Sequence, residues 1–479
     1  MTQPSPDSEA LDDVAVVGLG VMGANLARNF ARRGLRVGGF DLDPGAGARL
    51  AASEPDGQFC ISASLAEMVA RLERPRRIIL LVNAGPAVDA VLDGLAPHLE
   101  ADDIVVDGGN SLYTDTDRRN ARAASEVWRF VGMGISGGSE GALLGPSLMP
   151  GGDVEAWRRL SPVLTAISAK SASGPCVTYC GRGSAGHFVK MTHNGIEYGD
   201  MQLIAEAATL LRRGLGQSAA QVSATFAAWN EQELDSYLID ITADIFLADD
   251  PQQPGAPLVD AIVDQAGQKG TGRWTVMAAI ELGVPIPTIA AALDARALSS
   301  GRGLRLEAEG ALRPRDAEPF AGVDVDTLRR ALFASKMASY TQGFAMLRAA
   351  SAERDYGIDL AEVARIWTAG CIIRAGFLGV ISETYRADPE LPLLALAPAL
   401  APQLREATPA LRRTVSAAAL AGIPVPALSA SLGWLETLAT ARGSANIIQA
   451  QRDYFGSHTY RRIDAPDVPV HTDWPRRGR

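Results

Sequence analysis

Cysteine and aromatic residues are scarce in this chain. Four cysteines among 479 residues are too few for a disulfide framework. Cys176 and Cys180 lie close together, but no second pair of cysteines or histidines accompanies them, which disfavours a zinc site and favours small core residues. Because aromatic residues make up only 6% of the chain, Ala, Leu and Val must fill most of the core.

Positive charge and long apolar runs are also in short supply. The formal net charge is -10 and the sequence pI is about 5.2, which argues against nucleic acid as a partner, because phosphate binding needs a basic surface. No run of 18 apolar residues occurs, and the segment from Met1 to Asp13 lacks the basic and apolar parts of a signal peptide. We therefore expect a disordered tail at residues 1–13 and a soluble, cytoplasmic protein with no membrane partner.

Lysine is the third scarce residue type. Only four of the 45 basic residues are lysines, namely Lys170, Lys190, Lys269 and Lys336. Arginine keeps its proton near neutral pH, whereas a lysine amine can release its proton when its surroundings lower its pKa. A lysine in such a background indicates a site that needs a deprotonatable amine or a compact charge, although a structural lysine would look the same.

A dinucleotide-binding fingerprint stands near the N-terminus. The β-branched run Val14–Val17 is followed by glycines 18, 20 and 23, an Ala-rich helical stretch, a second strand at residues 36–40 and then Asp41. Such glycines let the backbone approach a pyrophosphate at a helix N-terminus. The Asp41 carboxylate would accept hydrogen bonds from both ribose hydroxyls and repel a 2′-phosphate. The next residue, Leu42, offers no positive charge to that phosphate. The local chemistry favours NAD over NADP.

Further strands are predicted at residues 78–82, 104–107 and 130–133, separated by helical stretches, as in a parallel sheet. Asn83, the loop Gly108–Asn110 and the loop Ser136–Gly138 follow them, and ligands of open α/β sheets bind outside the carboxyl ends of the strands. These loops are therefore expected to face nicotinamide and substrate, although ordinary turns also use Gly-Gly pairs. With strands at 146–152 and 177–180, the Rossmann-type domain would span residues 14–183.

From residue 184 the pattern becomes helical, and it contains an internal repeat. The segment Thr275–Pro287 recurs as Thr414–Pro426, with seven of thirteen positions identical at an offset of 139, and Trp229 and Trp367 fall at an offset of 138. This predicts a large all-helical domain at residues 184–440, built from a duplicated unit and followed by an extended C-terminal tail at residues 441–479.

Within the first repeat, one helix carries a polar face. Lys190, His193, Asn194 and Glu197 stand at i, i+3, i+4 and i+7, so they share one side of a helix, and the opposite side is apolar. A solvated stripe is the alternative to a lined cleft. The second repeat has Lys336 without the other polar residues, so we expect one working copy and one copy that supports packing or a subunit interface.

A Gly-rich loop at residues 265–274 opens another helix of the first repeat. Its backbone N–H groups, Lys269 and Thr271 form a candidate phosphate cradle, although a simple helix-capping loop would have the same pattern. The spacing does not match a Walker A loop, so the motif does not indicate an NTPase.

These motifs together resemble the 6-phosphogluconate dehydrogenase family over essentially the whole chain after Asp13. The matching stretches are the fingerprint and residues 75–82, 107–111, 145–152, 190–202 and 267–272, together with the C-terminal tail. The resemblance implies oxidation of 6-phosphogluconate by hydride transfer to a nicotinamide, loss of carbon dioxide and tautomerisation to ribulose 5-phosphate. It also implies a site without a metal ion and a homodimer in which each tail enters the partner's active site.

The resemblance also assigns roles to individual residues. Lys190 is the general base for the C3 hydroxyl, and Glu197 is the acid that protonates the enediol carbon. The residues that would hold the carboxylate and hydroxyls are Asn110, Ser136, Gly137, Gly138, His193 and Asn194, and those that would hold the phosphate are Tyr198, Lys269, Thr271, Arg296 and the partner's Arg452, with the partner's His458 joining them. The fingerprint and the resemblance together predict cofactor contacts from Gly18, Gly20, Val21, Met22, Gly23, Asp41, Leu42, Val82, Asn83 and Asn110.

Three departures from the family pattern bear on the cofactor. Many members carry Asn-Arg-Thr where this chain has Asp41-Leu42-Asp43, a lysine at the position of Asn83 and an acidic residue at the position of Ser139. Two positive groups are thus missing from the cofactor side and one negative group is added. We therefore expect NAD(P)+ as the cofactor, with a preference for NAD.

Two rival functions remain open on the sequence. A non-decarboxylating β-hydroxyacid dehydrogenase shares the fingerprint, the Ser-Gly-Gly loop and a Lys-x-x-x-Asn helix, but the duplicated unit and the basic set Lys269, Arg296 and Arg452 disfavour it. A catalytically inactive dinucleotide-binding dimer is disfavoured because every expected catalytic position is filled.

Overall fold

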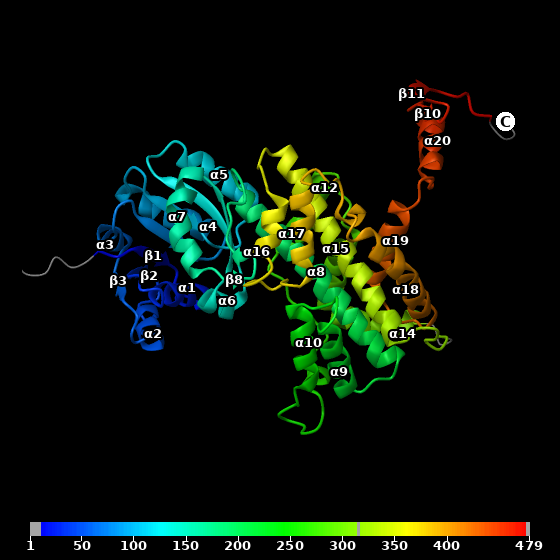
Figure 1. Cartoon of the computed structure of the whole chain (residues 1–479), viewed down its shortest axis with the longest axis horizontal. Coiled ribbons are helices and arrows are strands. Elements are labelled where there is room, and N and C mark those ends of the chain that lie inside the picture. Colours follow the sequence, from blue (N-terminus) through cyan, green and yellow to red (C-terminus); the bar gives the residue numbers. More distant parts are fainter. Residues whose placement is uncertain (1–10, 314–316, 476–479) are drawn as a thin grey trace, which may run out of the picture. The chain divides into compact units, whose positions relative to one another are not determined.

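The computed structural model describes residues 11–313 and 317–475. They form two compact units, one that ends at Ser431 and one that begins at Leu432. The first unit contains an α/β part, coloured blue to cyan in Figure 1, and a large helical part. None of the helices in the described ranges is long and apolar enough to cross a membrane.

The α/β part is built on a seven-stranded sheet with the order β3-β2-β1-β4-β5-β6-β7. All neighbouring strands pair in parallel except β6 and β7, which are antiparallel. The strands are β1 (Val14–Val17), β2 (Val37–Phe40), β3 (Phe59–Ile61), β4 (Arg77–Leu80), β5 (Ile104–Asp107), β6 (Arg129–Ser136) and β7 (Ser147–Gly152). The order reverses between β1 and β4, which is the switch point where doubly wound sheets bind their ligands.

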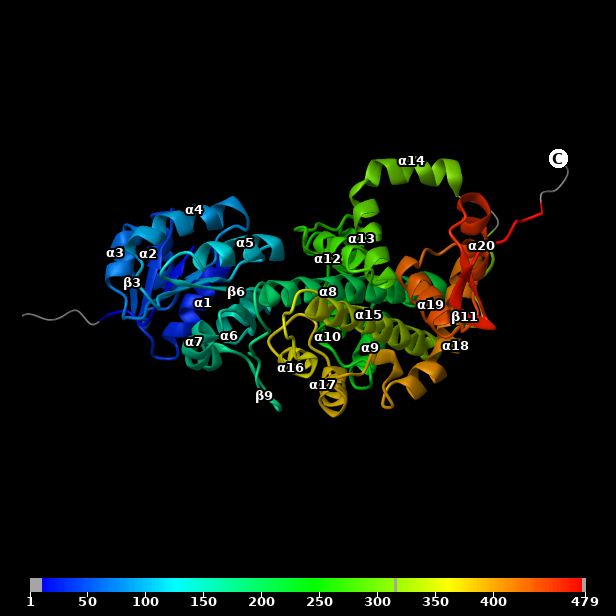
Figure 2. The same cartoon turned by 90° about the horizontal axis from the view of Figure 1, so that it is seen from above.

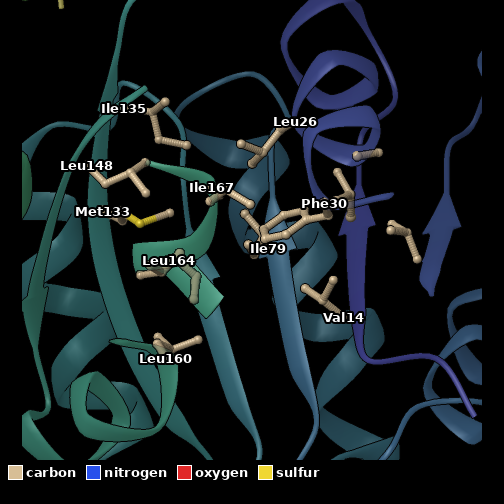
Figure 3. Close-up of a cluster of buried hydrophobic side chains, with 14 of the residues drawn as sticks. Val14, Leu26, Phe30, Ile79, Met133, Ile135, Leu148, Leu160, Leu164 and Ile167 are labelled. Atoms are coloured by element: carbon tan, nitrogen blue, oxygen red, sulfur yellow. The ribbon is translucent and has the colours of Figure 1, made fainter. Parts of the chain in front are cut away.

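Helices cover both faces of this sheet. They are α1 (Val21–Ala31), α2 (Ala46–Ser53), α3 (Leu65–Ala70), α4 (Pro86–Leu95), α5 (Tyr113–Ala123), α6 (Gly138–Leu144) and α7 (Val154–Ile167), with a short 3₁₀ turn at Ala96–His98. Val14 and Val16 of β1 face one core, which Phe30 of α1 helps to fill, whereas Ala15 and Val17 face the other core. Figure 3 shows Phe30 in the first core beside Val14 and Ile79. Both faces of β1 are thus buried, which explains its uninterrupted apolar sequence.

The sheet differs from the sequence-based expectation in three details. The strand after residue 146 runs antiparallel to β6, β3 was not predicted, and residues 177–180 make only an isolated bridge, between Val177 and Leu148. Residues 1–10 of the expected N-terminal tail lie outside the described residues. Asp12 pairs with the backbone of Leu72, so ordered structure begins before the predicted first strand.

The helical part is organised around two long helices, α8 (Ala185–Thr209) and α15 (Val325–Glu353). Figure 2 shows them side by side, and a Cβ added at Gly199 of α8 would lie 2.4 Å from the Ser339 hydroxyl oxygen of α15. The other helices of this part are α9 (Ala219–Asn230), α10 (Tyr237–Leu247), α11 (Leu258–Ala261), α12 (Thr271–Glu281), α13 (Pro287–Ser300), α14 (Arg302–Leu312), α16 (Leu360–Ile366), α17 (Phe377–Ala387), α18 (Ala401–Leu420) and α19 (Pro426–Leu438), with short helical turns at Leu210–Gly214 and Leu394–Leu396 and a small β8–β9 ladder at Lys170–Ser171 and Gly174–Pro175 before α8.

The internal repeat of the sequence corresponds to matching elements. Its first copy covers the end of α12 and the start of α13, and its second copy covers the end of α18 and the start of α19. Trp229 is the second-last residue of α9 and Trp367 follows α16, and both indoles are buried. The predicted fold class, a Rossmann-type domain followed by a large helical domain, is confirmed.

Glycines allow α8 to start directly against the sheet. A Cβ added at Gly186 would lie 2.2 Å from the Gly132 carbonyl oxygen of β6 and 2.4 Å from the Met149 carbonyl oxygen of β7. One turn later, a Cβ on Gly134 would lie 2.3 Å from the Cβ of Lys190. The absence of side chains at these positions therefore lets the helix carry Lys190 onto the end of β6.

The second unit contains the end of α19, α20 (Ala445–Gly456) and the antiparallel strands β10 (Tyr460–Arg462) and β11 (Ala465–Val470). Asp453 is buried at its centre and accepts hydrogen bonds from the Thr459 and Thr472 backbone and from the Trp474 indole, with His471 2.9 Å away. This one carboxylate therefore ties α20 to the chain on both sides of the strand pair.

Gly186→Ala is expected to destabilise the protein by about 3 kcal/mol, at the upper end of the usual cost of overpacking, because the backbone atoms that the new methyl group meets cannot rotate away. Urea unfolding followed by circular dichroism measures the effect. Gly379→Ala in α17 is the matched control, since nothing lies within 4 Å of its Cβ position, and it should stabilise the protein by about 0.5–1 kcal/mol. Equal urea midpoints of unfolding for the two variants would contradict the close approach of α8 to the sheet.

Candidate active site

The turn after β1 forms an open cradle at the N-terminus of α1. Gly18 has a φ of +93°, and a Cβ on Gly23 would lie 1.8 Å from the Gly18 carbonyl oxygen, so both positions require glycine. Gly20 is the N-cap of α1, nothing lies within 4 Å of its Cβ position, and Val21 beside it is exposed. The free backbone N–H groups of this helix end therefore fit a dinucleotide pyrophosphate.

The loops after β4 and β5 approach the same turn. A Cβ on Gly18 would lie 3.1 Å from the Val82 side chain, and a Cβ on Gly109 would lie 3.5 Å from the Val82 carbonyl oxygen. Asn83 follows Val82, and Asn110, which follows Gly109, is exposed. The predicted cofactor residues at the ends of β1, β4 and β5 therefore converge on one side of the sheet.

Asp41 follows β2 and braces the fingerprint turn. Its carboxylate accepts hydrogen bonds from the Leu19 N–H at 2.6 Å and from the Asp43 N–H at 2.8 Å. The next side chain, Leu42, is 90% exposed, and Asp43 forms an ion pair with Arg49. The surface beside the fingerprint turn thus carries two carboxylates and one cation. That cation, Arg49, was not expected from the sequence.

A buried ionic network fixes the loop that carries Asn110. Asp107 ends β5 and accepts hydrogen bonds from the Gly109 N–H at 3.1 Å, the Ser111 hydroxyl at 2.7 Å and the Arg119 guanidinium at 3.1 Å. Arg119 is fully buried and also binds Asp89. This network holds the loop in shape and leaves the Asn110 side chain free to reach a ligand.

The polar face of α8 is buried, so the solvated-stripe alternative is wrong. Lys190 is 6% exposed, His193 is fully buried, and Asn194 is 9% exposed. Hydrogen bonds of 3.2 Å join His193 Nε2 to the Ser136 hydroxyl and His193 Nδ1 to the side-chain Oδ1 of Asn194. The Glu197 carboxylate lies 3.8 Å from His193 Nδ1. The predicted residues of β6 and α8 therefore form one connected cluster.

The Ser136–Gly138 loop closes one side of this cluster. Ser136 ends β6, and Gly137 and Gly138 have φ values of +120° and +64°. A Cβ on Gly137 would lie 2.6 Å from the Gly370 carbonyl oxygen. The loop therefore has a backbone shape that favours glycine, and it lies against the segment that follows α16.

Burial shifts the acid–base properties of this face. Desolvation lowers the pKa of the Lys190 amine, although the charge of Glu197 and the neighbouring Cys371 oppose the shift. Desolvation raises the pKa of the Glu197 carboxyl, against the nearby charges of Lys190 and Arg296. The pKa of His193 is also lowered, first by burial and then by Lys190, so the imidazole is neutral near pH 7. The amine therefore loses its proton more readily, and the carboxyl keeps its proton more readily, than either group does in water, and these shifts suit a base and an acid.

A second cluster lies farther along α8. The Arg296 guanidinium of α13 stacks over the Tyr198 ring at 3.9 Å, and a Cβ on Gly272 of α12 would lie 2.5 Å from the same ring. Thr271 is the first residue of α12, directly after Gly270 in the left-handed region, while Lys269 is exposed. A helix N-terminus with a cation and two hydroxyls beside it fits a phosphate group.

The structure adds to this site three residues that were not assigned to it from the sequence. The Trp367 indole packs edge-on against His193, with 5.4 Å between ring centroids. Ile372 comes within 3.9 Å of the Cβ position of Gly138, and Cys371 is buried close to Lys190. Burial raises the pKa of the Cys371 thiol to about 12, so the thiol stays neutral. The second repeat therefore supplies a wall of the first repeat's site, and only the repeated tryptophan hinted at this in the sequence.

Arg452 and His458 lie in the second unit. Arg452 extends from α20, where it donates a hydrogen bond of 3.1 Å to Gln449, and His458 follows the helix end with its ring 6.0 Å from that of Phe455. Both side chains are exposed. Both side chains are thus accessible to a ligand, and both belong to the same compact unit.

Comparisons with known proteins match both parts of the chain. Residues 13–181 match the NAD binding domain of 6-phosphogluconate dehydrogenase, and residues 186–474 match the C-terminal domain of 6-phosphogluconate dehydrogenase. The decarboxylating 6-phosphogluconate dehydrogenase of Synechococcus elongatus is 50% identical over 97% of this chain and 100% of its own. The NADP(+)-dependent, decarboxylating enzyme of Bacillus subtilis is 47% identical over 96% of this chain and 98% of its own.

A solved structure agrees with the sequence matches. The 6-phosphogluconate dehydrogenase of Plasmodium falciparum, determined in its apo form, with its cofactor NADP+ and with its substrate 6-phosphogluconate, superimposes with a TM-score of 0.93. It is 40% identical, and the match covers 96% of this chain and 100% of that one. The chain therefore belongs to the family of decarboxylating 6-phosphogluconate dehydrogenases, which are NAD(P)-dependent oxidoreductases.

Proposed function

We propose that this protein converts 6-phosphogluconate and NAD(P)+ into ribulose 5-phosphate, carbon dioxide and NAD(P)H. The observation that carries the proposal is the shared face of α8, where Lys190 and Glu197 are both desolvated and their pKa values are shifted in opposite directions. Shifts in these directions suit Lys190 to the role of a base and Glu197 to the role of an acid. Release of carbon dioxide distinguishes this function from that of a non-decarboxylating β-hydroxyacid dehydrogenase, and turnover excludes an inactive dimer.

The substrate would lie along α8. Its phosphate would bind at the N-terminus of α12, beside Tyr198 and Arg296, because cation and helix end both favour an anion. Its carboxylate and hydroxyls would meet the cluster of Ser136, His193 and Asn194 at the other end. Lys269, Thr271, Asn110, Gly137 and Gly138 complete the proposed binding set.

Lys190 begins the reaction by accepting the proton of the C3 hydroxyl. When bound, NAD(P)+ accepts the hydride from C3. The Lys190 ammonium then donates its proton to the new ketone oxygen while the carboxylate leaves as carbon dioxide, which gives an enediol. Lys190 takes that proton back as Glu197 protonates the carbon that carried the carboxylate. One net proton transfer from Lys190 to Glu197 resets the site.

We propose that the fingerprint residues Gly18, Gly20, Val21, Met22 and Gly23 hold the dinucleotide, together with Val82, Asn83 and Asn110. Preference for NAD rests on Asp41, which would also accept from the ribose hydroxyls, and on Leu42, which offers no charge to a 2′-phosphate. Arg49 is a cation close to this turn, but its ion pair with Asp43 offsets its charge and so weakens its attraction for a 2′-phosphate.

We also propose a homodimer in which the partner's Arg452 and the partner's His458 complete each active site. Exposed apolar side chains on the second unit support this proposal: Phe455 is 73% exposed and Ile463 is 83% exposed. The first unit offers an apolar groove of about 620 Å³, lined by Met201 and Ile204 of α8 and Ile245 of α10 among others. Surfaces of this kind mark association sites.

Lys190→Arg is expected to lower kcat about 10²- to 10⁴-fold, because a guanidinium keeps the positive charge but cannot act as a base near pH 7. The dissociation constant for 6-phosphogluconate, measured by calorimetry, should change only a few-fold. Lys170→Arg, at an exposed lysine outside the site, is the matched control and should leave both quantities unchanged. Retention of wild-type kcat in Lys190→Arg would exclude Lys190 as the base.

The ratio of kcat/KM for the two cofactors measures the proposed NAD preference. Wild-type protein should favour NAD, and the double variant Asp41→Asn/Leu42→Arg should shift the ratio toward NADP at least about tenfold, since one repulsive charge is removed and one attractive charge is added. Leu42→Arg alone separates the two contributions. A strong NADP preference in the wild type would refute the argument from Asp41.

Complementation tests the exchange of tails. Lys190→Met and Arg452→Ala homodimers should each be nearly inactive, and co-expression should restore up to about a quarter of wild-type activity. Half of the dimers are then hybrids with one site that carries both defects and one intact site. No recovery in hybrids, isolated by means of two affinity tags, would mean that Arg452 serves the active site of its own chain.

A further inference from the structure

A second lysine forms a buried ion pair directly behind the acid–base face. Lys336 of α15 contacts the Asp200 carboxylate of α8, and both side chains are fully buried. The two helices approach closely beside this contact, because a Cβ on Gly199 would lie 2.4 Å from the Ser339 hydroxyl oxygen. Lys336 is the second repeat's lysine, so the duplicated unit directs its amine into the first repeat's catalytic helix.

A buried ion pair of this kind is a weak source of stability. Removing two charges from water costs several kcal/mol per ion, and apolar residues of similar volume often stabilise a core as well or better. The surroundings compensate this cost in part: the Tyr340 hydroxyl interacts with the Asp200 carboxylate, whose second oxygen has no hydrogen-bond partner by distance and angle among the described residues, and the Phe377 ring lies 5.9 Å from the Lys336 amine. Tyr340 close by donates its hydroxyl hydrogen to the Ile373 carbonyl oxygen.

Asp200 stands one helical turn after Glu197 and therefore on the same side of α8. The groups that face Glu197 are His193 and Lys190 on α8, Arg296 on α13 and Tyr340 on α15. Lys190 and Arg296 are cations that favour the ionised form of Glu197, and the pKa of His193 is lowered so that it adds no charge. Desolvation is the largest cause that raises the pKa of Glu197, and the Asp200 carboxylate acts in the same direction.

We propose that the Lys336–Asp200 pair is a positioning pair for the proton of Glu197. Lys336 holds the Asp200 carboxylate between α8 and α15, and the charge of that carboxylate adds to burial in favouring the proton-donating form of the neighbouring Glu197 against its two cationic neighbours. The inference rests on the proposed function, in which Glu197 donates a proton to carbon. It gives the second repeat a part in the reaction without placing any of its titratable groups on the substrate.

The test compares two double variants that each neutralise a buried pair. Asp200→Asn/Lys336→Met removes the pair behind Glu197, and Asp103→Asn/Arg76→Met removes a similarly buried pair in the α/β part, where Arg76 and Asp103 are 2.7 Å apart. The measurements are the pH profile of kcat with 6-phosphogluconate and the exchange of the C1 proton of ribulose 5-phosphate in deuterium oxide, followed by NMR. The exchange reports the Glu197 step without net oxidation.

Neutralising the Asp200 pair should move the alkaline limb of the kcat profile down by about one pH unit, because Glu197 then loses its proton at lower pH. Exchange above that limb should slow about tenfold. The control variant Asp103→Asn/Arg76→Met should lose thermal stability, but the alkaline limb of its kcat profile should stay at the wild-type pH. Asp200→Asn alone, which preserves volume, should shift the limb in the same direction, and this variant decides the question if the double variant does not fold.

Superimposable profiles for the Asp200 variants and the wild type would overturn the inference, as would an equal shift in the Asp103 control. A wild type that neither turns over 6-phosphogluconate nor exchanges the ribulose 5-phosphate proton would overturn the proposed function instead. The two failures are therefore distinguishable.

Discussion

The site depends on how closely α8 approaches the sheet. Because Gly132, Gly134 and Gly186 have no side chains, the helix starts against β6 and β7, and the stem of Lys190 lies on β6. That contact excludes water from the amine, and exclusion of water is what lowers its pKa. The same approach brings Ser136 to His193, so the packing between sheet and helix produces both the geometry and the electrostatics of the site.

The duplicated helical unit has two different uses. Its first copy supplies the polar face of α8, and its second copy supplies Trp367, Cys371 and Ile372 around that face and Lys336 behind it. Two lysines of a chain with four thus lie on the two long helices. One has a lowered pKa next to a candidate substrate space, while the other is held by a carboxylate, so the two copies place their lysines in different surroundings.

Local patterns in the sequence were sufficient for the fold class and for much of the site. The fingerprint is contiguous, so Gly18, Gly20 and Gly23 could be placed from spacing alone, and the helical period placed Lys190 and Glu197 on one face. The antiparallel direction of β7 could not be predicted, because an apolar run does not encode strand direction. Trp367 and Ile372 were missed for a related reason: they join His193 and Gly138 only after α16 packs against the Ser136–Gly138 loop.

Electrostatic surroundings were harder to foresee than positions. The sequence placed Asp41 at the end of β2, but only the structure shows that its two oxygens already bind the Leu19 and Asp43 backbone, and that Arg49 approaches Asp43. Likewise, the four-lysine count drew attention to Lys336, whereas its partner Asp200 lies 136 positions away in the chain. Burial and pairing depend on neighbours that are distant in sequence, so they follow from tertiary structure.

The continuity of α8 has a mechanical consequence. Lys190, Glu197 and Tyr198 all stand on one unbroken 25-residue helix, so the proposed base and the proposed acid are separated along its axis by about 10.5 Å, seven residues at about 1.5 Å each. A rigid helix of this kind fixes the distance between the two groups. Because α8 starts directly against β6 and β7, any shift of the helix against the sheet would move both side chains together and leave their spacing unchanged.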